Sequence, residues 1–179
     1  MDIVRFEPSA NEGAGRALPA SSLSNFFEAA AALSAKPLCR KKNILLHVSS
    51  YEIDDGDLLE LARAGSAFVF SFSDILSESG FRRAIIISKM RLALSACRKR
   101  GTSFVFVTLA KDVSSMRGAR ELVAFATVLG ATDVERKAAE KNIGRLTGDG
   151  AKLKKTIEAP AHAGSVNGLP AGKIPRVEK

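Results

Sequence analysis

The chain has 179 residues, which is long enough to bury one core. Its formal net charge is +8 and its pI is near 9.8, so an acidic partner such as a nucleic acid is favoured. No run approaches the roughly 20 apolar residues that a membrane-spanning helix needs, and the first residues lack the pattern of a signal peptide. Two cysteines, Cys39 and Cys97, are too few for a disulfide framework. We therefore expect a soluble cytoplasmic protein with no membrane contact.

Short apolar runs and helical patterns alternate along the first three-quarters of the chain. The apolar runs predict β-strands at Ile3–Phe6, Ile44–Val48, Phe68–Phe72 and Phe104–Val107. The last three runs are continuously apolar, which is typical of parallel strands buried on both faces. Helical patterns lie at Leu23–Ala35, Asp57–Ala64, Phe81–Lys99 and Arg120–Leu129. This alternation predicts parallel βα repeats with right-handed crossovers.

The pattern changes after the fourth helix. Gly130 is a natural helix end, and Thr132 with Glu135 forms a capping box that predicts a further helix. From residue 147 onward Gly, Ala, Pro and Lys dominate, so we expect a disordered basic tail at 147–179 after an α/β domain at 1–146. Pro8–Ala20 is also poor in core residues and predicts a loop. Four strands are too few for an eight-stranded barrel, which leaves a half-sized barrel or an open doubly wound sheet.

The predicted helix at Phe81–Lys99 lies in the most basic part of the chain, because the segment from Gly80 to Arg100 has seven Lys and Arg residues and no carboxylate. A helical wheel gives it an apolar core stripe, formed by Ile86, Ile87, Met90, Ala93, Leu94 and Cys97. A second apolar line on the opposite side, formed by Phe81, Ile85 and Leu92, predicts a contact with either another subunit or the N-terminal segment of this chain. The alternative is a solvated basic helix with isolated apolar residues on its surface.

Basic residues also follow the last predicted strand, at Lys111, Arg117 and Arg120. Ligands of parallel α/β proteins collect at the carboxyl ends of strands, and helix N-termini attract phosphates. Gly118 would let a backbone approach closely. This loop is therefore a candidate phosphate contact, although Arg120 also fits an ordinary helix start and Lys111 an ordinary solvated side chain.

The sequence contains no motif of catalysis or metal binding. It has two histidines, His47 and His162, and it lacks the HxH, HExxH and CxxC patterns that metal sites use. Ser49, His47 and Asp74 could be drawn as a triad, but no nucleophile elbow accompanies them. We therefore expect no catalytic and no metal-binding residue in this chain, which favours a binding component over an enzyme in its own right.

Several segments match a known family in order and with compatible spacing. They are AFVFSFSDIL, SKMRLALSACRKRG, FVFVTLAKD, MRGARELVAF and VLGATDVERKAAEKNIGRL, which fill most of the Ser71–Leu146 segment and the four residues before it. KNILLHVSS and DGDLLELARAG match an earlier strand and helix. They resemble ribonuclease P protein component 3, which includes the thirty-kilodalton subunit of the eukaryotic enzyme, and the short length fits the archaeal form. Two positions depart from the family: Ala119 stands where a proline is usual, and VTLA replaces SSGA.

The resemblance implies a TIM-like barrel, here truncated or incomplete because early βα units of the family are missing. It also implies a noncatalytic subunit of the ribonucleoprotein endonuclease that removes 5′ leaders from precursor tRNA. In that enzyme the RNA subunit performs the hydrolysis with bound magnesium, and this chain itself binds no cofactor. The implied partners are the ribonuclease P RNA, a small ferredoxin-like subunit, other ribonuclease P proteins and, indirectly, precursor tRNA.

The predicted site therefore consists of two sets of side chains. RNA-phosphate and partner-carboxylate contacts are assigned to Arg83, Lys89, Arg91, Arg98, Lys99, Arg100, Lys111, Arg117 and Arg120. Protein-partner contacts are assigned to the outer apolar line. Alternatively, Arg83 and Arg91 brace the helix against a loop carboxylate. Two other functions stay open: a divergent metal-dependent hydrolase of a related barrel family, with ligands other than histidine, and a purely protein-binding module with an acidic partner.

Overall fold

The computed structural model describes residues 2–5 and 17–147, all within one compact unit at Met1–Gly148. The expectations for Phe6, for most of Pro8–Ala20, for His162 and for the basic tail from residue 148 onward lie outside the described residues. Ala17–Pro19, the described part of the predicted loop before Ala20, is not a loop. It forms the short strand β2, which pairs with β1 (Asp2–Val4) in a separate parallel pair.

The main sheet has four parallel strands in the order of the sequence. They are β3 (Phe26–Ala29), β4 (Leu45–Val48), β5 (Ala67–Ser71) and β6 (Ser103–Val107). The predicted parallel βα repeats are therefore confirmed. A doubly wound sheet requires a reversal of the strand order, and the strand order of this sheet has none.

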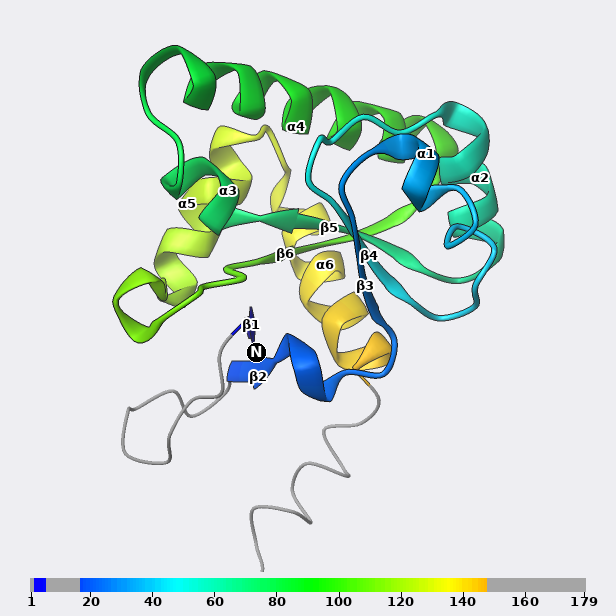
Figure 1. Ribbon diagram of the computed structural model, residues 1–179, viewed down its shortest axis with the longest axis horizontal. Helices are drawn as coiled ribbons and strands as arrows, with labels where there is room; N and C mark the ends of the chain where they lie inside the picture. The colour runs from blue at the N-terminus through cyan, green and yellow to red at the C-terminus, as the bar shows by residue number, and fades with distance from the viewer. Residues whose placement is uncertain (1, 6–16, 148–179) are drawn as a thin grey trace, which may run out of the picture. The chain divides into compact units, whose positions relative to one another are not determined.

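Six α-helices accompany the strands in the described residues: α1 (Ala32–Ala35), α2 (Asp55–Arg63), α3 (Phe72–Leu76), α4 (Gly80–Arg100), α5 (Ala119–Val128) and α6 (Asp133–Leu146). Short 3-10 turns lie at Ala20–Ser22 and Val113–Ser115. Figure 1 shows α4 lying along one side of the sheet, with α2 beside its C-terminal end. The helices α2, α4 and α5 match their predicted ranges closely, whereas α3 was not predicted: β5 ends at Ser71 and a short helix begins at Phe72.

The strands send alternate side chains to two cores. On one face a cluster of aromatic rings packs against α2, α4 and α5, with Phe68, Phe70, Phe104 and Phe106 at its centre. The other face packs against Ile143 and Leu146 of α6, and its strand residues are Leu45, Ala67, Val69, Val105 and Val107. Figure 1 shows α6 crossing this second face. The helix α6 therefore covers the side of the sheet that would be the interior of a barrel.

The sheet is open in the described residues, because β3 and β6 do not pair with each other. The strand β1 lies near both of them. Backbone hydrogen bonds of 2.8 Å join it to the segment after β6, from Leu109 N to Ile3 O and from Arg5 N to Ala110 O. The guanidinium of Arg5 also lies 2.6 Å from a carboxylate oxygen of Glu28 in β3. Complete closure of a barrel stays a prediction from the family resemblance.

The predicted helix at Leu23–Ala35 is wrong. Only its end is helical, as α1, and its middle forms the edge strand β3. Phe26 packs toward the core that α6 covers, whereas Phe27 packs toward the aromatic core. This alternation and the pairing of Phe26 with Leu45 fit a strand. The contacts made across the sheet therefore override the helix propensity of the alanine-rich segment.

The predicted core stripe of α4 is confirmed: Met90, Ala93, Leu94 and Cys97 are buried, and Ile86 and Ile87 are partly buried against the same core. The capping box that starts α6 is also confirmed, since Thr132 Oγ1 accepts a hydrogen bond from the Glu135 backbone N–H and the Glu135 carboxylate accepts one from the Thr132 N–H. Gly130 before it has a φ of +90°, which a side chain would strain.

Candidate functional site

Two arginines of α4, Arg91 and Arg98, attach this helix to the end of α5, the connection that follows it and the start of α6. Arg91 donates from Nε and Nη2 to the carbonyl oxygen of Val128, at 3.1 and 2.8 Å. Arg98 forms two hydrogen bonds to the Glu135 carboxylate, of 2.6 and 2.8 Å, and a third of 2.6 Å to the carbonyl oxygen of Gly130. The hydrogen bond from Arg98 holds the pKa of Glu135 at about 2. These side chains therefore stabilise the fold, whatever else they bind.

The other cations of α4 also have partners within the chain. Lys99 and Arg100 both contact the carboxylate of Asp55 at the start of α2, and the hydrogen bond from Arg100 lowers the pKa of Asp55. Two more contacts join Lys89 to Glu52, at 2.8 Å, and Arg83 Nε to the carbonyl oxygen of Glu78, at 2.7 Å. Arg83 and Arg91 thus do brace the helix, but carbonyl oxygens accept these hydrogen bonds rather than a loop carboxylate.

The three loop cations differ from one another. Arg117 donates to the carbonyl oxygens of Ser114 and Met116, at 3.1 and 2.8 Å, and its Nε lies 3.9 Å from Glu121. Lys111 and Arg120 are exposed and have no partner among the residues that the structure describes. Of the nine predicted cations, these two are the ones that would contact a phosphate without losing an internal contact.

The predicted apolar line on the outer side of α4 is exposed to solvent. The exposed fraction is 81% for Phe81, 39% for Ile85 and 72% for Leu92. These three side chains fall on one side of a helix that buries its opposite stripe, so they are available to a partner. The contact itself stays a prediction.

Near the carboxyl ends of the strands the structure brings together a buried charged network. From the sequence, His47 and Asp74 are combined only as members of a possible triad, which includes neither Glu28 nor Tyr51. Nε2 of the fully buried His47 lies 2.8 Å from Oδ2 of Asp74, and its Nδ1 lies 3.3 Å from Oε1 of Glu28. Tyr51 donates its hydroxyl to the same Asp74 oxygen, at 2.7 Å, and accepts a 3.1 Å hydrogen bond from the backbone N–H of Ser71. The network thus joins residues that lie in, or a few positions after, the neighbouring parallel strands β3, β4 and β5.

The charges of this network stabilise one another. Burial alone would lower the pKa of His47, but the contacts with Asp74 and Glu28 outweigh burial and raise it. In return, the contact with His47 and the guanidinium of Arg5 hold the pKa of Glu28 at about 2. Burial would raise the pKa of Asp74, yet the hydrogen bond from His47 keeps it lowered. The two carboxylates therefore favour the protonated form of His47.

The arrangement does not complete a catalytic triad. His47 and Asp74 are paired, but no hydrogen bond joins Ser49 to His47 in the described part of the chain, and Ser49 is exposed. Nε2 of His47 is hydrogen-bonded to Asp74, whereas its buried Nδ1 lies 3.3 Å from Glu28 and has no hydrogen-bond partner in the described part of the chain. Within residues 2–5 and 17–147, no three His, Cys, Asp or Glu side chains are grouped so that they could hold a metal ion. No described helix is long and apolar enough to span a membrane.

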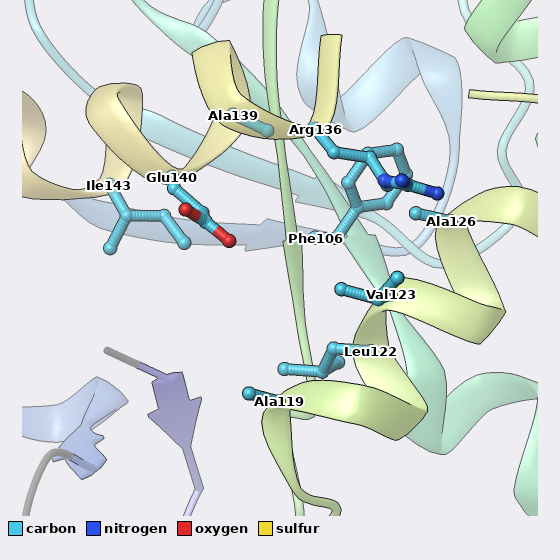
Figure 2. A pocket seen from close by; sticks show the side chains of 9 residues that line it. All are labelled: Phe106, Ala119, Leu122, Val123, Ala126, Arg136, Ala139, Glu140 and Ile143. Atoms are coloured by element: carbon cyan, nitrogen blue, oxygen red, sulfur yellow. The ribbon is translucent and has the colours of Figure 1, made fainter. Parts of the chain in front are cut away.

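A hollow of about 150 Å³ lies between α5 and α6 and is mostly apolar (Figure 2). Its walls include Phe106, Leu122 and Ile143, and its charged residues are Arg136 and Glu140. The guanidinium of Arg136 is already bound to Thr127 Oγ1, at 2.5 Å, and to Asp133. The hollow therefore lacks the convergent free polar groups of a catalytic pocket.

The fold defines this chain as a parallel α/β protein. No protein-family model matches the chain, and no curated protein matches it. Its fold is similar to that of a chain in the cryo-EM structure of archaeal ribonuclease P with mature tRNA, with a TM-score of 0.62 and 15% sequence identity. The match covers 83% of this chain and 65% of that chain, so this chain spans somewhat less than two-thirds of the length of its structural neighbour.

Proposed function

We propose that this chain is a noncatalytic protein subunit of a ribonuclease P and acts in the cytoplasm. There it supports the catalytic RNA in the removal of 5′ leaders from precursor tRNA. The observation that carries this proposal is the fold, which over 83% of the chain is similar to a chain of archaeal ribonuclease P. The family resemblance of the Ser71–Leu146 segment, which the sequence provides independently, points to the same enzyme.

Two surfaces supply the proposed contacts. The nine predicted cations of α4 and of the loop after β6 would bind RNA phosphates, and Arg82 is not one of them. Of the nine, Lys111 and Arg120 are exposed and have no partner among the described residues. The outer line of Phe81, Ile85 and Leu92 would bind a small ferredoxin-like subunit, because exposed aromatic and aliphatic side chains at one patch are typical of protein interfaces. Magnesium in such a complex belongs to the RNA.

Reconstitution of cleavage tests the proposal. Archaeal ribonuclease P RNA, its protein subunits and a labelled precursor tRNA are combined with and without this chain, over a range of magnesium concentrations. Because cations that neutralise RNA phosphates lower the need for other cations, we expect omission of the chain to raise the magnesium concentration at half-maximal cleavage. Identical rates and magnesium dependence with and without the chain would refute the proposal.

A variant sharpens this test. K111Q/R120Q removes two unpaired cations of the proposed RNA surface, and R82Q/K137Q removes two exposed cations that belong to neither proposed set and have no partner in the described part of the chain. The first pair should shift the magnesium dependence and the second should not. Capture of a protein partner that resists nuclease treatment, without any effect on cleavage, would instead favour the purely protein-binding module. No group of described residues supports the metal-dependent hydrolase.

A further inference from the structure

We propose a second RNA-binding surface, which we call the basic end: Arg40, Lys41, Lys42, Arg63 and Arg145. It lies where β4 and β5 begin, whereas the loop cations Lys111, Arg117 and Arg120 follow the end of β6. Its ligand would be the phosphate backbone of RNA, bound without regard to sequence. The inference rests on the proposed function and adds to it a surface that neither the basic helix nor the family resemblance pointed to.

Hydrogen bonds hold the turn before β4 against the connection between α2 and β5. Ser66 Oγ donates to the carbonyl oxygen of Lys41, at 2.8 Å, and the N–H of Asn43 donates to the carbonyl oxygen of Ala64, at 3.1 Å. Arg63 is the last residue of α2, directly before Ala64. The cations of the turn and of the end of α2 are therefore fixed side by side rather than carried on a free loop.

The end of α6 joins the same place. Nη1 of Arg145 donates to the carbonyl oxygen of Gly65, at 3.0 Å. The side-chain amide of Asn25 donates both to Asn43 O, at 2.9 Å, and to Leu146 O. Three segments that are distant in the sequence thus bring their positive charges to one end of the sheet.

Few internal carboxylates neutralise these charges. Arg40 and Lys42 are exposed and have no partner among the described residues, and the Lys41 ammonium lies 4.2 Å from the centre of the Phe27 ring. Within the basic end, the one carboxylate contact that the structure records is Arg63 with Glu60, at 3.2 Å. On α4, by contrast, Arg98, Lys99 and Arg100 are all paired with carboxylates. Binding of a phosphate at the basic end therefore breaks fewer internal ion pairs.

The composition of the surface favours RNA over a protein partner. None of the large apolar side chains that are exposed on the described residues belongs to residues 40–43, 63–66 or 145–147. Protein interfaces depend on buried aromatic and aliphatic anchors, whereas phosphate binding needs only cations and N–H donors. Arg63 and Arg145 also complement the C-terminal dipoles of α2 and α6, but Arg40 and Lys42 lie in a turn, where no helix end accounts for them.

RNA binding of the full chain, measured by fluorescence anisotropy with a labelled RNA duplex at several salt concentrations, tests the basic end. Because each neutralised phosphate releases counterions, R40Q/K42Q should weaken binding about tenfold and reduce the slope of log affinity against log salt by about 2. The control R82Q/K137Q has the same loss of charge and should stay within about twofold of the original protein. Circular dichroism establishes that both variants are folded.

The outcomes separate this inference from the proposed function. If R40Q/K42Q binds RNA as the control does, the basic end is not an RNA surface, even where the chain is required for cleavage. A loss of binding to a protein subunit with RNA affinity unchanged would likewise overturn it. If omission of the original chain changes neither the magnesium requirement nor the cleavage rate, the proposed function fails. The phosphate-binding role of Arg40 and Lys42 is then still decided by the anisotropy measurement alone.

Discussion

Nε2 of His47 lies 2.8 Å from Oδ2 of Asp74, and this pair joins the end of β4 to the helix that follows β5. Glu28 of β3 approaches the other ring nitrogen, so one imidazole links three consecutive βα units. Its position at the carboxyl ends of parallel strands is where α/β enzymes bind substrates. Here the same position is occupied by Asp74, which is hydrogen-bonded to both His47 and Tyr51, and by Glu28, which lies 3.3 Å from Nδ1 of His47 without a hydrogen bond. Because these contacts join neighbouring parts of the open sheet, we call the network the clasp.

The clasp predicts how stability depends on pH above neutrality. The folded protein raises the pKa of His47 above its ordinary 6.5, so the stabilisation is complete below pH 6.5 and is lost as the pH rises through the folded pKa. We expect the free energy of unfolding to fall as the pH rises above about 6.5, measured by urea denaturation followed by circular dichroism. H47Q should abolish this fall and H162Q should retain it; an equal fall in H47Q would contradict the assignment.

On the acid side the sign is opposite. The pKa of Glu28 is about 2 in the folded protein against an ordinary 4.5, so its stabilisation is present above pH 4.5 and is lost as the pH falls toward 2. Glu135, also at about 2, loses its contact with Arg98 over the same range. Both carboxylates are partly exposed, so each contributes only about 1 kcal/mol. In the same denaturation series, E28Q should flatten part of the acid decline while leaving the part due to Glu135.

Removal of the Tyr51 hydroxyl tests the buried part of the clasp. Y51F takes a donor from Asp74 and an acceptor from the backbone N–H of Ser71, both in a buried site. We expect the free energy of unfolding to fall by about 1–3 kcal/mol, because an unsatisfied buried polar group loses its full hydration. S77A is the control: its exposed hydroxyl donates to the carbonyl oxygen of Asp74, and its loss should change stability by less than about 0.5 kcal/mol. Equal effects of the two substitutions would show that the buried Tyr51 hydroxyl adds no more to the free energy of unfolding than an exposed hydroxyl does.

The sequence predicted the parts of this fold that depend on local patterns. The strands β4, β5 and β6 are continuous apolar runs and α4 has an apolar stripe, so the predicted ranges are close to the observed ones. The start of α6 follows from its capping box. The strand β3 was missed because its partners in β4 decide its conformation, and no local pattern in an alanine-rich segment reports them. The same limit applies to the sites. The contacts of His47 with Asp74 and of Arg98 with Glu135 join residues 27 and 37 positions apart, and only the strand register and the crossing of the helices bring them together.

A comparison of Arg98 with Lys111 distinguishes cations that stabilise the fold from cations that bind RNA. R98Q loses the paired hydrogen bonds to Glu135 and the bond to the carbonyl oxygen of Gly130, so the free energy of unfolding should fall by about 1 kcal/mol, as expected for a largely exposed ion pair with one additional hydrogen bond. K111Q, which removes an unpaired cation, should leave stability unchanged and weaken RNA binding. Thermal melts and RNA anisotropy on both variants make the comparison. If R98Q melts like the original protein, its bonds to the α5–α6 connection do not stabilise the fold.

The outer apolar line of α4 predicts a contact with a partner protein. Because its side chains are exposed, they can be replaced without changing the core. Leu92 is 72% exposed, so L92D should change the free energy of unfolding by less than about 0.5 kcal/mol. If Leu92 anchors a protein interface, burying the new carboxylate should weaken binding of the small partner subunit by at least about 30-fold, the factor that corresponds to a hot-spot loss of about 2 kcal/mol. V134D places the same charge at a residue that is 78% exposed on α6 and is the control. Calorimetric titration with the purified subunit measures both variants, and equal affinities for L92D and V134D would remove this side of α4 from the interface.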